Sequence, residues 1–523
     1  MDAPQLPSSF LSAWSAALAD QQMAQRNDFP SYHIDDPVSA LVTSCQPRTI
    51  TTGTGASIFK ETLLPALSQA RREIILVTCF WAESETLQSL RETLENMAAR
   101  REAERTRWGA AQRQNPENRL RISLCFSSSG VLQKLLHPQS TRGRVYQPKE
   151  WQGLGLPSAD TLSRGGIDLT VKSLFFLPFS VMHPKFLLVD RERAWMPSCN
   201  VSWESWFETC IEFEGPAVGA LLAFHESVWS IHNAGDYKDT QDVDETNDHV
   251  NTRDSDHFPP PGPIEHRNSA IGAGVENMTS QYESLTLVTP AQNKFDFAPS
   301  TSCPAVILPS SHHINPHFRL VPYTAGAPPP PTPLNVALLT LFSNAQKHIE
   351  IMTPNLTSDP AIEALLDALQ RGVDVTLRTS RNMMTVEQLV TAGTTTAWKL
   401  KAMVARYRKM QTQRYHAQSS GPLSDIEGQQ TSGLGKLEIY YYKSNKYALT
   451  QPGASLDEPV LAHAKVVLVD NEYMILGSGN MDRASWFTSQ ELGILLYMPG
   501  FSSDVWRTPL ESRQECIWES GTE

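Results

Sequence analysis

One pattern occurs twice in this sequence, and the repetition constrains the fold more than any other feature. Residues 181–200 read VMHPKFLLVDRERAWMPSCN, and residues 461–480 read LAHAKVVLVDNEYMILGSGN. Both contain His-x-Lys-x4-Asp-x7-Ser-x-Asn, and a Ser-Trp-Phe triplet follows each copy. Further upstream, Ala-x3-Ile-x3-Thr occurs at residues 70–78 and again at 345–353, at nearly the same separation along the chain. Two features at similar separations indicate duplication of a whole half rather than of a short motif.

Each copy of the motif is expected to form a strand. The run from Lys465 to Val469 is apolar and β-branched, which is typical of a buried strand. Residues two apart on a strand point to one face, so His463 and Lys465 should project together, as should His183 and Lys185. A second strand over residues 473–476 should pair back and bring the following Ser and Asn to the same end of the sheet.

The regions around the motifs alternate between helical and strand-like patterns, which predicts an α/β fold with helices on the faces of a sheet. An N-terminal helix from Ser9 to Gln25 is expected to pack on the domain rather than to contact a membrane. The expected helices are 56–72, 84–105, 214–232, 334–347, 359–371 and 386–415, and the expected strands are 74–80, 120–126, 168–171, 349–353, 373–377 and 437–442.

Composition changes along the chain suggest five regions. Residues 234–299 are rich in Asp, Asn, Ser and Pro, which is typical of a flexible linker. The predicted regions are an N-terminal helical extension (1–46), a first half (47–232), a polar and proline-rich linker or insertion (233–303), a second half (304–508) and a C-terminal tail (509–523).

Charge and cysteine content exclude some functions. The formal net charge of −12 argues against a dedicated nucleic-acid binder, although it leaves room for a local basic cleft. The basic stretch 399–414 is interpreted as a solvated helix face, with an anionic partner as the alternative. The seven cysteines include no CxxC pair, so we expect reduced thiols, no zinc site and a cytoplasmic protein. No run of 18 apolar residues predicts a transmembrane helix.

The paired motifs suit the cleavage of a phosphodiester. One neutral imidazole can attack phosphorus and form a phosphoryl-enzyme, while a second can protonate the leaving alkoxide. The two motif lysines, together with the motif asparagines, can bind nonbridging oxygens and stabilise the charge that shifts in the transition state. Because the lysines supply positive charge, we expect neither a metal nor a cofactor.

The twice-repeated His-Lys-Asp pattern resembles the signature of the phospholipase D superfamily. The resemblance implies two pseudo-twofold-related halves, each a mixed β-sheet flanked by helices, with the active site at their interface. It also implies that His183 is the nucleophile and His463 the general acid and base. In the resembled family, acids after each motif orient the imidazoles, a role that falls to Glu491 and, displaced by one residue, to Glu212.

The resemblance carries the remaining site residues over one by one. The catalytic motif comprises His183, Lys185 and Asp190 with His463, Lys465 and Asp470, the two aspartates being expected to support the motif architecture. The phosphate-binding residues are Ser198, Asn200, Ser478 and Asn480. The first copy departs from the pattern at Pro184, Pro197 and Cys199.

The layout is closest to the cardiolipin synthase and phosphatidyltransferase branch. We therefore expect an enzyme that cleaves or transfers the phosphatidyl group of glycerophospholipids through a phosphohistidine. It is expected to be a cytoplasmic monomer that contacts membranes peripherally, with a phospholipid favoured over a nucleic acid as its partner. The alternative is a nuclease or DNA-end-processing phosphodiesterase, which the same site chemistry permits but which needs a positive cleft for duplex DNA.

Overall fold

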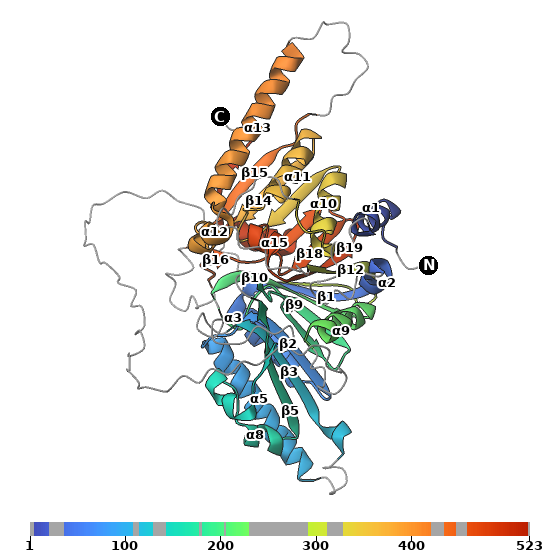
Figure 1. Cartoon of the computed structure of the whole chain (residues 1–523), viewed down its shortest axis with the longest axis vertical. Helices are drawn as coiled ribbons and strands as arrows, with labels where there is room; N and C mark the ends of the chain where they lie inside the picture. The colour runs from blue at the N-terminus through green and yellow to red at the C-terminus, as the bar shows by residue number, and fades with distance from the viewer. Residues whose placement is uncertain are drawn as a thin grey trace, which may run out of the picture. The chain divides into compact units, whose positions relative to one another are not determined.

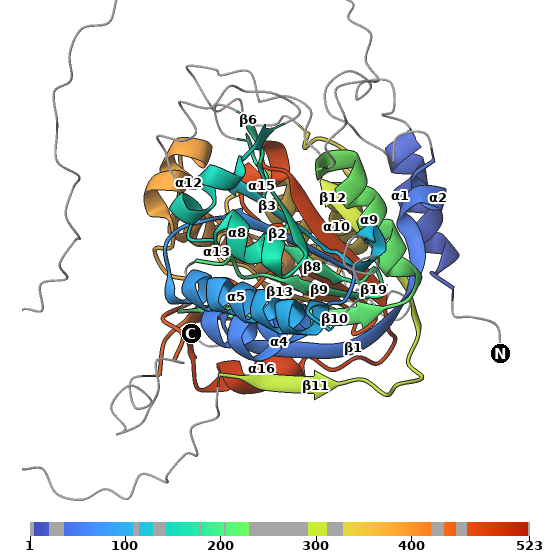
Figure 2. The ribbon, with the colours of Figure 1, turned by 90° about the horizontal axis from the view of Figure 1, so that it is seen from below.

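The computed structural model describes most of the chain. The described residues are 5–19, 36–107, 115–128, 143–176, 180–202, 205–229, 291–310, 328–419, 433–445 and 458–520. Most of the predicted linker, 233–303, lies outside them, but its last part contains strand β11 (Asn293–Asp296), which pairs with β1. Figure 2 shows β11 alongside β1.

The first half contains a mixed sheet in which three strands run parallel. β2 (Glu73–Phe80), β3 (Leu120–Ser128) and β5 (Ile167–Ser173) are parallel neighbours, and every other neighbour pairs antiparallel. The full order is β1 (Val42–Thr54), β10 (Trp206–Glu214), β9 (Arg193–Pro197), β8 (Phe186–Val189), β2, β3, β5 and β4 (Arg144–Val145).

The second half repeats this strand order and these directions. Its order is β12 (Cys303–Ser310), β19 (Glu491–Tyr497), β18 (Tyr473–Gly477), β17 (Val466–Val469), β13 (His348–Met352), β14 (Asp374–Thr379), β15 (Leu437–Tyr442) and β20 (Gln514–Glu519). Only β13, β14 and β15 are parallel to one another. The recurrence agrees with duplication, while a twofold rotation between the halves stays a prediction.

Two strand pairings join the halves. β1 pairs antiparallel with β12, from Val42 opposite Val306 to Cys45 opposite Cys303. β16 (Leu461–Ala462), which directly precedes the second motif histidine, pairs parallel with β10. The backbone of each half is therefore hydrogen-bonded to the other close to the motif.

Helices cover the sheet (Figure 1). In α5 the buried residues Leu87, Leu90, Leu94 and Met97 recur every three or four positions, which gives the helix one apolar face. The helices are α1 (Ser8–Ala19), α2 (Pro37–Leu41), α3 (Gly55–Ile58) continuing through a π-helical turn (Phe59–Leu63) into α4 (Leu64–Ser68), α5 (Glu85–Arg105), α8 (Ala159–Arg164), α9 (Pro216–Trp229), α10 (Pro333–Asn344), α11 (Asp359–Gln370), α12 (Thr385–Ala392), α13 (Thr396–Ser419), α15 (Arg483–Phe487) and α16 (Asp504–Glu511). Short 3₁₀ turns span Pro116–Asn118, Pro148–Glu150 and Gln152–Leu154, and β6 (Phe175–Phe176) pairs with β7 (Ser180–Val181).

The fold class is confirmed as a mixed α/β sheet flanked by helices, but two element predictions are wrong. The single helix expected over 386–415 is two helices, because Gly393 adopts a left-handed conformation (φ 61°) that ends α12. The expected tail, 509–523, contains the end of α16 and the edge strand β20, which pairs with β15.

The N-terminal helix α1 packs on the second half. Trp14 is fully buried, and its indole Nε1 donates to the backbone oxygen of Pro333 at 3.1 Å. Among the described residues, no helix is long and apolar enough to cross a membrane.

Candidate active site

Each motif histidine is anchored to the backbone of the opposite half. The amide of His183 donates to the carbonyl oxygen of Gln490 at 2.9 Å, and the amide of His463 donates to that of Phe207 at 2.8 Å. The indole ring of Trp206 also lies against the His463 imidazole, with ring centroids 4.8 Å apart. Both histidines are thus fixed where the halves meet.

A carboxylate from the opposite half accepts a hydrogen bond from each imidazole. His183 Nδ1 lies 2.7 Å from Glu491 Oε2, and His463 Nδ1 lies 2.7 Å from Glu208 Oε1. Both acids are 1% exposed. Ionised carboxylates only accept, so each Nδ1 carries the proton and the lone pair of each neutral imidazole is on Nε2.

The motif serines hold these acids in place. Ser478 Oγ donates to Glu491 Oε2 at 2.6 Å, and Ser198 Oγ donates to Glu208 Oε2 at 2.5 Å. Ser485, which sequence reasoning missed, donates to the other Glu491 oxygen at 2.7 Å. The two serines therefore contact the acids rather than the phosphate position that the sequence analysis gave them.

The choice of Glu212 as the second orienting acid is wrong. Cys210 lies opposite Pro197, just as Gly493 lies opposite Gly477, so the register makes Glu208 the equivalent of Glu491. Glu212 lies four residues further along β10, about 13 Å away at the usual strand rise. There it pairs with Arg193.

The motif lysines are buried beside the imidazoles, at 1% and 3% exposure. Each lysine Nζ donates to the backbone oxygen of its motif histidine, and Lys465 Nζ also lies 2.8 Å from His463 Nε2. Burial lowers the pKa of both ammonium groups, to about 7 for Lys465. The two halves are therefore chemically unequal, because only His463 has a lysine on its Nε2.

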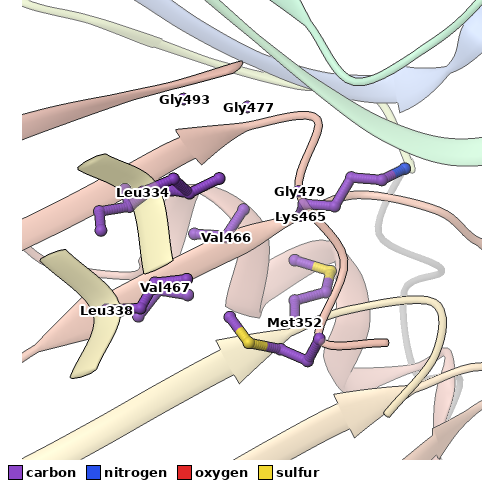
Figure 3. Close-up of a pocket in the computed structure, with 11 residues that line it drawn as sticks. Leu334, Leu338, Met352, Lys465, Val466, Val467, Gly477, Gly479 and Gly493 are labelled. Atoms are coloured by element: carbon purple, nitrogen blue, oxygen red, sulfur yellow. The ribbon is translucent and has the colours of Figure 1, made fainter. Parts of the chain in front are cut away.

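Figure 3 shows how the second motif strand presents its lysine. The Lys465 side chain extends away from the apolar cluster around Leu334, Val466 and Met352. The pocket within that cluster has a volume of about 20 Å³, room for about one water molecule. Lys465, which directly precedes β17, thus points away from the side on which Val466 packs.

Burial sets the protonation states of the site. It lowers the pKa of His463 to about 3 and also lowers that of His183. Burial by itself would raise the pKa of the Glu208 and Glu491 carboxyls. The facing imidazoles have the larger combined effect, so the pKa of each carboxyl lies below its ordinary value. Without substrate, the site holds neutral imidazoles against ionised carboxylates.

The motif asparagines differ between the halves. Asn200 Oδ1 accepts from the amides of Cys79 and Phe80 at 3.2 and 3.3 Å, which leaves its buried Nδ2 without a partner among the described residues. Asn480 Nδ2 instead donates to Asp482 Oδ2 at 3.0 Å. Asn200 therefore offers an unpaired donor, while phosphate binding by Asn480 stays a prediction.

The motif aspartates lie at the far end of the motif strands, and counting them as catalytic is wrong. Asp190 accepts from the amides of Arg71, Arg72 and Glu73. Asp470 accepts in the same way from the amides of residues 346–348. Both have positive φ, 55° each, in the turn that follows the motif strand. They tie this turn to the start of the neighbouring strand, which is the architectural role also expected.

A cavity of about 720 Å³ opens onto both histidines. Asp482, a further residue that sequence reasoning missed, lines it, and burial raises the pKa of its carboxyl. No group of three or more potential metal-ligating side chains occurs in the part of the chain that the structure describes. The apolar part of the lining is Phe80, Phe175, Val181, Met384, Val386, Val390 and Ala484.

Residues 338–508 match the family model of the cardiolipin synthase, phospholipase D-like domain. No curated protein matches the sequence.

Three solved structures match the chain, each with a TM-score under 0.5. Phosphatidylserine synthase from Haemophilus influenzae has 10% identity and a TM-score of 0.49, with 96% of this chain and 92% of that chain covered. Polyphosphate kinase from Porphyromonas gingivalis has 11% identity and a TM-score of 0.37, with 86% and 47% covered. The phospholipase D family member Nuc from Salmonella typhimurium has 17% identity and a TM-score of 0.20, with 35% and 90% covered.

Residues 338–508, in the second half, thus match a phospholipase D-like domain, and the first half carries the same motif.

Proposed function

We propose that this protein is a phosphodiesterase of the phospholipase D type that cleaves or transfers the phosphatidyl group of glycerophospholipids. The observation that carries the proposal is the crossed pairing of each imidazole with an acid from the other half. It gives one cavity two imidazoles with defined tautomers, His183 held by Glu491 and His463 held by Glu208. Two such groups suit a double displacement at phosphorus.

In the first step, Nε2 of His183 attacks phosphorus and the bond to the headgroup oxygen breaks. The imidazolium of His463 gives its Nε2 proton to the departing alkoxide. In the second step, neutral His463 takes a proton from water or an alcohol, whose oxygen attacks phosphorus and breaks the P–N bond. Histidine and product are thereby released, and His463 is again protonated.

The assignment of His183 as nucleophile is supported by the inequality of the two lysines. Lys465 Nζ contacts Nε2 of His463, the atom that an attack by His463 would need. Lys185 contacts only the backbone oxygen of its histidine among the described residues, which leaves Nε2 of His183 clear of its own lysine.

Substrate charge completes the protonation state that the first step needs. A phosphodiester anion beside His463 favours the imidazolium and raises its pKa from the low value of the empty site. Lys185, Lys465 and the unpaired Nδ2 of Asn200 are the donors that we assign to the nonbridging oxygens.

A lipid substrate is favoured over a nucleic acid by the cavity lining and by the family model. Phe80, Phe175 and Val181 give the cavity an apolar wall suited to acyl or glycerol carbons. A nucleic acid would instead demand a basic groove along its backbone, against a net charge of −12 for the chain.

The test is a transfer reaction. Purified protein is incubated with phospholipid vesicles and a primary alcohol, and products are identified by mass spectrometry. Phosphatidylalcohol made by wild type and not by His183→Asn supports the proposal. Cleavage of single-stranded oligonucleotides with no lipid product would contradict it and favour the nuclease alternative.

A further inference from the structure

Helix α12 presents an apolar face outward. Val386, Leu389 and Val390 are 76%, 42% and 56% exposed, and their spacing of three and four residues puts them on one side of the helix. Trp398, near the start of α13, is 60% exposed. A surface helix ordinarily turns such residues toward the core. These four residues are termed the α12 face.

The opposite side of α12 is polar and locked in place. Gln388 is 4% exposed, and its amide nitrogen donates to the Met383 carbonyl oxygen. Its Oε1 accepts from the backbone amide and the hydroxyl of Thr396 at 2.6 and 2.9 Å. Rolling the helix to bury the valines would break these bonds, so the apolar side is held outward.

The α12 face is continuous with the candidate active site. Val386 and Val390 are exposed at the surface and also line the cavity that holds His183 and His463. Figure 1 shows α12 beside α15, which follows the second motif. The route from the surface to the histidines is therefore bordered by apolar side chains.

We propose that the α12 face docks on the surface of a phospholipid bilayer and turns the cavity mouth toward the lipid. The inference rests on the proposed function and adds the means by which the substrate reaches the site. A phospholipid drawn from a bilayer into the cavity would then keep its acyl carbons against Val386 and Val390 rather than in water. Trp398 suits the interface because indole has an apolar body and a polar N–H.

The docking is apolar rather than electrostatic. The four residues of the α12 face carry no charge, and the chain as a whole is acidic at −12. Binding to vesicles should therefore depend weakly on salt and should not require anionic lipid.

The experiment compares two variants of the full chain in sedimentation with phosphatidylcholine vesicles. Leu389→Asp with Trp398→Asp changes two residues of the α12 face that do not line the cavity. Gln411→Asp with Thr412→Asp adds the same charge at exposed positions of α13. The first variant should bind vesicles roughly tenfold more weakly or worse, since apolar contact area is lost. The second should bind like wild type.

Two further measurements separate docking from folding and chemistry. Hydrolysis of a water-soluble short-chain phosphatidylcholine should be equal in wild type and Leu389→Asp/Trp398→Asp. Brominated phospholipid in the vesicles should quench part of the wild-type tryptophan fluorescence, and Trp398→Phe should lose that part while it still binds. If the Leu389→Asp/Trp398→Asp variant loses activity equally on vesicle and soluble substrates, the two aspartates damage the active site. That result would overturn the docking surface.

The outcomes distinguish this inference from the proposed function. If wild type binds vesicles through the α12 face but processes no phospholipid, the docking surface is supported and the proposed reaction is contradicted. If Leu389→Asp/Trp398→Asp processes vesicle lipid as fast as wild type does, the docking surface alone is overturned. Self-association that Leu389→Asp abolishes, without vesicle binding, would overturn it in favour of a second copy of the chain.

Discussion

Replacement of Glu208 by Gln tests the crossed pairing of the halves most sharply. Glu208 is 1% exposed and accepts from both His463 and Ser198. Gln keeps the shape but removes the charge that stabilises the imidazolium of His463 during turnover. A hydrogen bond to a charged group contributes about 1.5–3 kcal/mol, and each 1.36 kcal/mol is tenfold in rate. We therefore expect kcat/KM to fall roughly ten- to hundredfold.

The pH profile of this variant has a defined sign. The negative charge of Glu208 raises the pKa of His463 against the effect of burial, so its removal lowers that pKa further. The general acid must be protonated, so the alkaline limb of kcat/KM should move to lower pH in Glu208→Gln. Initial rates of alcohol transfer measured across pH, normalised to folded protein by circular dichroism, give the shift.

Glu212→Gln is the matched control. Glu212 lies on the same strand and pairs with Arg193 and Thr49 instead of an imidazole. Its replacement should leave kcat/KM near the wild-type value. Equal losses in the two variants, or full activity of Glu208→Gln, would refute the assignment of Glu208 to His463.

Three further predictions concern stability. Asp470→Ala leaves three backbone amides without their acceptor, so the free energy of unfolding measured in urea should fall by about 1–2 kcal/mol. The activity per folded molecule should stay at the wild-type value. Loss of activity in folded protein would return Asp470 to the catalytic set. Lys465 has its pKa lowered to about 7 in the folded chain, against about 10.4 when unfolded, so the unfolded state holds more protons between these values. The free energy of unfolding should therefore rise with pH across this window more steeply in wild type than in Lys465→Met, and equal slopes would contradict the burial of its charge. Trp14→Ala should cost about 3–5 kcal/mol in urea unfolding because the indole is fully buried on the second half, and an unchanged midpoint would show that α1 contributes nothing to stability.

The strands that carry the motifs could be predicted because their signal is local. The apolar runs place β8 and β17 in the sheet interior. His463 and Lys465, which were expected within a strand, lie in the short connection between β16 and β17. The repeat of strand order in both halves follows from the same local patterns.

The sequence analysis missed Glu208 because the Ser-Trp-Phe triplet, which is identical in the two halves, has a different secondary structure in each half. Trp486 lies in helix α15, which delays the start of β19, whereas Trp206 already begins β10. Matching the two Ser-Trp-Phe triplets therefore displaced the expected acid along the strand to Glu212. The register of paired strands decides the position, and a single sequence does not contain it.

The crossed contacts between halves also have no local signal. His183 and Glu491 are far apart in the chain, and their contact arises from the pairing of β1 with β12 and of β10 with β16. The orientation of helix α12 could not be predicted for a different reason. Gln388 is buried and hydrogen-bonded, whereas Val386 is exposed. Specific hydrogen bonds there outweigh the pattern that hydrophobicity alone predicts.

The proposed mechanism requires a covalent phosphohistidine at a defined residue, His183. The direct measurement is an alkaline quench of wild type during turnover of a phospholipid, followed by digestion and mass spectrometry of the histidine-containing peptides. We expect a phosphatidyl adduct on His183 in wild type and no adduct in His183→Asn. An adduct on His463, or turnover by His183→Asn, would contradict it.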